Sequence, residues 1–199
     1  MGFERFDIIN IIGFNAPEWF FANFGAIAAG GVSAGIYTTN NPEACKYVSH
    51  HSKAKVVVCE GMKQLEKYLQ IANDLSSHCK ALVMYGPDKL TDDVKNKCKI
   101  PIYTFDEFIK LGANVTDDKL TERKKAWKYG ETCTLIYTSG TTGPPKAVMI
   151  TNDNITWTCD TMLSTTRKGY MNNSDVMISY LPLSHIAAQM LDMHMVRTS

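Results

Sequence analysis

The feature that most constrains the fold is an alternation between short apolar runs and segments with helical spacing. Residues 8–14, 55–59 and 81–85 are short apolar runs that end at turn-forming or polar residues, as buried strands do. Residues 62–75 repeat apolar side chains at intervals of three and four, which predicts a helix. Strands that alternate with helices require crossover connections. The sequence therefore predicts an α/β fold, a mostly parallel sheet with flanking helices.

The charge balance and the cysteines narrow the class of protein. Lys and Arg number 21 and Asp and Glu 20, a net charge of +1, which argues against a nucleic-acid partner. Hydrophobic residues make up 45% of the 199 residues, enough for a packed core of about one domain. No two of the six cysteines lie within four residues of each other, so neither a metal knuckle nor a CxxC motif is present. This pattern indicates reduced, mostly buried thiols and a cytoplasmic setting.

A long uncharged stretch could be mistaken for a membrane-spanning helix. Residues 19–42 contain no Asp, Glu, Lys or Arg, but they include four glycines together with Asn and Ser residues. A membrane-spanning helix needs about 20 predominantly apolar residues, and this stretch is too polar for that. It predicts a buried helix followed by a strand.

Three local features are predicted around these elements. Asn15 precedes Pro17 and Glu18 and is expected to cap the uncharged helix. Residues 176–181 are expected to form a further strand. Ser184 is expected to cap the last helix.

The segment with the clearest chemistry comes after a predicted strand at residues 132–137. It contains hydroxyls, glycines and a lysine, in the order Thr138, Ser139, Gly140, Thr141, Thr142, Gly143, Pro144, Pro145, Lys146. Glycines allow tight turns that present N–H groups to an anion, the hydroxyls add donors, and the lysine adds a positive charge. The Walker A pattern does not fit. An ordinary Ser/Thr/Gly loop is the alternative, but the run is long and particular, so a polyphosphate-binding loop is predicted.

Residues 138–146 resemble the phosphate-binding signature of the adenylate-forming superfamily, which contains acyl-CoA synthetases, luciferases and the adenylation domains of peptide synthetases. Within that superfamily the chain most resembles long-chain-fatty-acid–CoA ligases of the bubblegum type. Residues 13–20, 35–40, 153–157 and 179–189 carry that closer resemblance, so it spans most of the chain.

The resemblance implies a fold, a reaction and partners. Residues 1–199 would be part of the large N-terminal, AMP-binding domain. The enzymes first form an acyl-adenylate from a fatty acid and ATP, with Mg²⁺, and then transfer the acyl group to coenzyme A. Thr138 to Lys146 would hold the β- and γ-phosphates, and His185 would lie at the wall between the nucleotide and acyl pockets, although a purely structural helix histidine remains the alternative. Long-chain substrates further imply a cytoplasmic enzyme with peripheral contact to the endoplasmic reticulum membrane.

The chain departs from the family signature at Ala147, where glycine is usual. Alanine would cost about 1–2 kcal/mol if the backbone there has a positive φ, and nothing if φ is negative. The sequence leaves both alternatives open.

The second departure concerns the later motifs of the family. The adenine-stacking and ribose-binding motifs and the C-terminal domain with the catalytic lysine are not found before Ser199. The expectation is therefore an incomplete chain, or a shortened isoform or gene model, inactive alone and without an assignable catalytic residue. Three alternatives stay open: a non-catalytic nucleotide-binding or regulatory protein, a chain that does not fold stably alone, and a ligase for another carboxylate.

Overall fold

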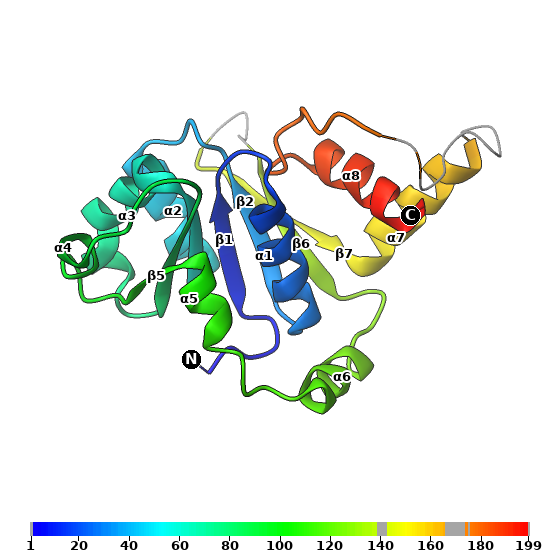
Figure 1. Cartoon of the computed structure of the whole chain (residues 1–199). Helices are drawn as coiled ribbons and strands as arrows, with labels where there is room; N and C mark the ends of the chain where they lie inside the picture. The colour runs from blue at the N-terminus through cyan, green and yellow to red at the C-terminus, as the bar shows by residue number, and fades with distance from the viewer. Residues whose placement is uncertain (1, 139–142, 166–173, 175, 199) are drawn as a thin grey trace.

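The strands build one sheet. The computed structural model describes residues 2–138, 143–165, 174 and 176–198. Within these residues seven strands line up in the order β5-β4-β3-β1-β2-β6-β7 (Figure 1). They are β1 Ile8–Ile12, β2 Val32–Ile36, β3 Val56–Glu60, β4 Ala81–Tyr85, β5 Ile102–Thr104, β6 Thr132–Thr138 and β7 Lys146–Thr151. All neighbours pair in parallel except β7, which runs antiparallel to β6. The predicted α/β fold with a mostly parallel sheet is confirmed.

The helices lie between and around these strands. They are α1 Pro17–Ala28, α2 Pro42–Ser52, α3 Gly61–Leu75, α4 Asp92–Lys95, α5 Phe105–Lys110, α6 Asp117–Lys125, α7 Asn152–Thr165 and α8 Ile186–Thr198. The uncharged stretch forms α1 and β2, as predicted. Among the described residues no helix is both long enough and apolar enough to span a bilayer.

Opposite faces of the sheet carry different helices. On β3, Val57 and Cys59 pack in one cluster with side chains of α2 and α3. Their neighbours Val56 and Val58 pack on the other face, with α1, α5 and residues 181–188. Successive side chains of a strand point to opposite faces. The central strands are therefore buried on both sides, which explains their continuous apolar runs.

The cysteines behave as the sequence predicts. All six lie within the described residues and form no disulfide, and every one except Cys98 is buried. Burial raises the pKa of the Cys133 thiol to about 11, so this thiol is protonated at neutral pH. These cysteines pack as small apolar side chains.

The strand predicted at residues 176–181 is wrong. The described residues of this segment form neither helix nor strand, and three alternate side chains, Val176, Ile178 and Tyr180, are 94%, 80% and 75% exposed. The pattern has strand propensity, but a strand forms only where a neighbouring edge accepts its hydrogen bonds. No described strand pairs with this segment.

Candidate functional site

The candidate phosphate loop joins the two strands of a hairpin. β6 ends at Thr138, β7 begins at Lys146, and these two residues face each other in the last pair of the antiparallel ladder. Thr138 and Lys146 are both exposed. Four predicted members, Ser139, Gly140, Thr141 and Thr142, lie outside the described residues. The described members therefore place both ends of the loop at the carboxyl end of β6.

Lys146 carries the positive charge of this loop. None of the ion pairs found among the described residues involves Lys146. An exposed ammonium group without a carboxylate partner can neutralise a phosphate oxygen. Gly143 has a φ of +94°, a left-handed conformation that favours glycine, although a Cβ there would meet nothing within 4 Å.

Ala147 does not strain the loop. It lies inside β7, pairs with Tyr137, and is not among the residues with a positive φ. The left-handed penalty considered for this position does not apply, because extended backbone accepts alanine. The departure from the family signature therefore costs no backbone strain here.

His185 lies directly before α8 and forms its cap. Its Nδ1 accepts a hydrogen bond from the backbone N–H of Ala187 at 3.1 Å, and its carbonyl accepts from Ala188 at 3.1 Å. The prediction that Ser184 is the capping residue is therefore wrong by one position, because α8 begins at Ile186 and its first backbone hydrogen bonds go to the carbonyl of His185. A neutral imidazole that accepts at Nδ1 carries its proton at Nε2. The exposed ring of His185 thus keeps one N–H donor for another group.

Asn15 holds the segment that leads to His185. Its side-chain Nδ2 donates to the carbonyls of Ser179 and Leu181 at 3.1 and 2.7 Å, and its Oδ1 accepts from the N–H of Leu183 at 3.0 Å. Its predicted role as a helix cap is wrong: the N-cap of α1 is Ala16, without a side-chain bond. Asn15 instead joins the end of β1 to residues 179–183.

A close approach at Gly35 supports the same junction. An ideal Cβ at Gly35, in β2, would lie 2.7 Å from Cα of Ser184. Only a residue without a side chain lets the backbone before α8 come so near to the sheet. Gly35 and Asn15 both lie in stretches of family resemblance, but no local pattern in the sequence indicates this role for either residue.

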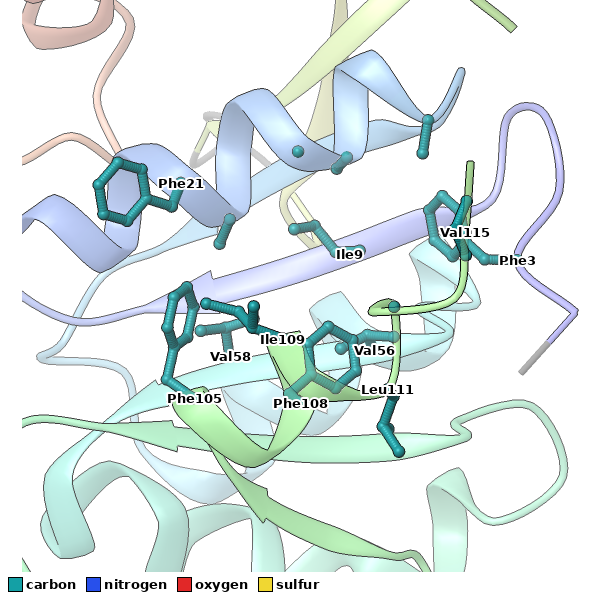
Figure 2. Close-up of a pocket in the computed structure, with 15 residues that line it drawn as sticks. Phe3, Ile9, Phe21, Val56, Val58, Phe105, Phe108, Ile109, Leu111 and Val115 are labelled. Carbon is teal, nitrogen blue, oxygen red and sulfur yellow. The ribbon is translucent and has the colours of Figure 1, made fainter. Parts of the chain in front are cut away.

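The structure also contains an apolar cavity of about 480 Å³ (Figure 2). It lies between α1 and α5, on the face of the sheet opposite α2, and its lining includes Phe3, Ile9, Phe21, Val58, Phe105 and Phe108. No described titratable or nucleophilic side chain lines it. The cavity therefore offers apolar contact but no chemistry.

The family resemblance implies Mg²⁺. Among the described residues no group of three or more His, Cys, Asp or Glu side chains comes together in a way that could hold a metal ion. A Mg²⁺ ion that arrives with ATP counts as part of the substrate.

The sequence matches known proteins along nearly its whole length. Residues 1–198 match the family described as AMP-binding enzyme. ACSBG2 of Xenopus laevis, named a long-chain-fatty-acid–CoA ligase, is 47% identical over 193 residues, which cover 96% of this chain and 25% of that protein. ACSBG1 of Mus musculus, with the same enzyme name, is 44% identical over 198 residues, covering 97% and 26%. The chain thus spans about a quarter of the length of these curated relatives.

Solved structures share the fold at low sequence identity. The N-terminal domain of FACL13 from Mycobacterium tuberculosis has a TM-score of 0.63 at 20% identity, covering 98% of this chain and 43% of that chain. The A-PCP didomain of a carboxylic acid reductase from Segniliparus rugosus, solved with AMP, has a TM-score of 0.68 at 17% identity, covering 98% and 28%. These likenesses support the fold alone, in agreement with the predicted N-terminal domain architecture.

Proposed function

The chain belongs to the AMP-binding enzyme family, and on that premise we propose that it is the phosphate-binding part of an ATP-dependent ligase. The proposed ligase joins a long-chain fatty acid to coenzyme A. The observation that carries the proposal is the pairing of Thr138 with Lys146 at the loop end of the β6–β7 hairpin, where Lys146 has no ion-pair partner among the described residues. The names of the relatives support the substrate class.

The proposed reaction has two steps. A carboxylate oxygen of the fatty acid attacks the α-phosphorus of ATP, the bond to the bridging oxygen breaks, and pyrophosphate leaves. The thiol of coenzyme A then attacks the acyl carbon of the adenylate, loses its proton and releases AMP. The first step brings two anions together, so fixed positive charge and hydrogen-bond donors near the phosphates lower its barrier.

Two residues have separate roles in this proposal. Lys146 neutralises charge on the β- and γ-phosphates, assisted by the hydroxyl of Thr138. His185 lies beside the acyl carboxylate and uses its Nε2–H as a donor, since its Nδ1 is engaged by Ala187. ATP, with its Mg²⁺, and coenzyme A are both substrates here. We further propose a cytoplasmic enzyme with peripheral contact to the endoplasmic reticulum membrane, because long acyl chains partition into bilayers.

The experiment is fatty-acid-dependent exchange of labelled pyrophosphate into ATP, measured on the whole ligase of which this chain is proposed to be a part, because residues 1–199 alone are expected to be inactive. We expect exchange with palmitate, its loss in Lys146→Met, and its retention in Lys110→Met, which removes an exposed lysine of α5. Nucleotide binding without exchange would instead favour a non-catalytic nucleotide-binding protein. Absence of both would refute the proposal.

A further inference from the structure

The last turns of α2 contact both ends of the candidate phosphate loop. Tyr47 Oη donates a hydrogen bond to the carbonyl of Pro145 at 2.9 Å. His51 Nδ1 lies 2.9 Å from Tyr137 Oη. Pro145 directly precedes Lys146, and Tyr137 directly precedes Thr138. The two contacts therefore hold the chain next to the two described residues proposed to meet phosphate.

The rings of Tyr47, His51 and Tyr137 also pack against one another. Tyr47 and His51 are four residues apart, so they lie on one face of α2. Their rings stack with centroids 5.6 Å apart at 23°, while the rings of His51 and Tyr137 meet edge to face at 5.8 Å and 82°. Aromatic pairs favour such offset and edge-on arrangements. The hydrogen bonds thus belong to a packed cluster, which limits the orientations of each ring.

The cluster stands on a helix that is fixed to the core. Asn41 caps α2 by accepting from the N–H of Ala44 at 2.9 Å, and the side chains of Cys45 and Val48 are buried. Ser49 Oγ lies 3.2 Å from the hydroxyl of Tyr68 in α3. A residue on such a helix can impose its position on a neighbouring loop, because its own backbone is held.

Tyr137 remains a hydrogen-bond donor at neutral pH. Burial raises the pKa of its phenol to about 12. Its Oη can donate to His51 Nδ1 and lies 3.4 Å from the carbonyl of Val48. His51 and Val48 both belong to α2, so hydrogen bonds from this one helix restrain the end of β6.

We propose that Tyr47 and His51 are positioning residues that set Thr138 and Lys146 for a polyphosphate. The inference rests on the proposed function and deepens it, because neither side chain itself needs to touch phosphate. A net hydrogen bond contributes enough to change an affinity by about threefold to tenfold, so loss of either contact should weaken pyrophosphate binding by that factor.

Three variants and one matched control test this. Tyr47→Phe keeps the ring and removes the hydroxyl. His51→Ala removes the imidazole, and His51→Asn restores a polar atom near the place of Nδ1. The control is His50→Ala: His50 is also in the last turn of α2, but its ring lies against His78, 5.7 Å between centroids.

The readouts are the dissociation constant for pyrophosphate, measured by calorimetry on the full chain, and Tm. We expect threefold to tenfold weaker binding in Tyr47→Phe and His51→Ala, recovery in His51→Asn, and unchanged binding in His50→Ala. The losses should occur without a Tm change larger than that of the control. Unchanged affinity for pyrophosphate in Tyr47→Phe and His51→Ala would overturn the proposal. So would a loss of affinity that is matched by a lower Tm and occurs equally in His50→Ala.

A second readout separates this inference from the proposed function. If the wild-type chain binds no pyrophosphate, the proposed function fails, and amide hydrogen exchange of the peptide covering residues 143–151 then decides about positioning. Faster exchange in Tyr47→Phe and His51→Ala, but not in His50→Ala, would support restraint of this end of the loop by α2. Equal exchange in all four proteins would refute it.

Discussion

The central strands bury their apolar side chains, whereas the edge strand β7 and the following helix α7 leave large apolar side chains exposed to solvent. Ile11, Val57 and Leu82 of β1, β3 and β4 are fully buried, whereas Met149 of β7 is 69% exposed and Trp157 of α7 is 66% exposed. Side chains of helices cover both faces of β1, β3 and β4, while β7 lies at the end of the sheet (Figure 1). Burial therefore depends on position in the sheet more than on residue type.

The candidate loop lies at the boundary between these two regions. Thr138 ends β6, which has a strand on each side, and Lys146 begins the edge strand β7. The hydrogen bond from Tyr47 of α2 to the carbonyl of Pro145 restrains the chain directly before β7. The contact between His51 and Tyr137 does the same on the β6 side, so both ends of the loop are held by contacts from outside their own hairpin.

The largest expected effect is the difference in unfolding free energy between a variant in the central strand β4 and a variant in the edge strand β7. Leu82→Ala removes a fully buried side chain and should cost about 2–5 kcal/mol of unfolding free energy, because a cavity remains. Met149→Ala should change it by less than about 0.5 kcal/mol, because the side chain is mostly in solvent. Urea denaturation measures both. Similar costs for the two variants would contradict the difference in burial between β4 and β7.

The next effect concerns the junction before His185. Asn15→Ala removes the partners of the Leu181 carbonyl and the Leu183 N–H and should cost about 1–3 kcal/mol. Hydrogen exchange should accelerate in residues 179–190 more than in β3. Asn15→Asp keeps the acceptor for Leu183 but places a carboxylate oxygen against the carbonyls of Ser179 and Leu181, so it should cost at least as much as Asn15→Ala. If residues 179–190 exchange as slowly in Asn15→Ala as in the wild type, the role of this side chain is refuted.

The close approach of β2 to Ser184 can be tested with two glycines, Gly35 and Gly25. Gly35→Ala places a Cβ 2.7 Å from Cα of Ser184, so it should cost about 1–3 kcal/mol through overpacking. Gly25→Ala, in α1, meets nothing within 4 Å and should be neutral or stabilising, since alanine favours helices over glycine. Thermal unfolding of the two variants tests this. Equal tolerance would mean that the contact between β2 and Ser184 is not tight.

The smallest effect is on pH dependence. Burial raises the pKa of the Asp192 carboxyl, which accepts from Ser179 Oγ at 2.9 Å. The folded state then binds this proton more tightly than the unfolded state, so its contribution to stability falls as pH rises above about 4, the usual Asp value. Asp192→Asn should lose less stability than the wild type between pH 4 and 7, as measured by urea midpoints. A steeper loss in the variant would contradict this sign.

The local pattern of apolar residues is sufficient to predict a strand where the strand propensity of a segment agrees with its place in the sheet. The apolar runs predict β3 and β4 nearly to the residue, because both faces of those strands are buried and continuous apolar runs report that. Residues 176–181 show the same kind of pattern without a described partner strand, so the strand predicted there is wrong. Propensity indicates what a segment can form, and pairing decides whether it does.

The candidate site can be predicted in part for a similar reason. The composition of residues 138–146 predicts a phosphate-binding loop, since the residues that carry this chemistry are consecutive in the sequence. The amide of Asn15 suits a helix cap, but its partners lie more than 160 residues away along the chain. Tyr47 and His51 contact the loop from another helix, and no local spacing indicates such contacts.

The most direct test of the central claim is calorimetric titration of the chain with pyrophosphate, comparing wild type, Lys146→Met and Lys110→Met. Hydrogen bonds to charged groups contribute enough that losing Lys146 should weaken binding by about tenfold to a hundredfold, while Lys110→Met should bind as the wild type does. Equal affinity in all three proteins would contradict the assignment of residues 138–146 as the phosphate-binding loop.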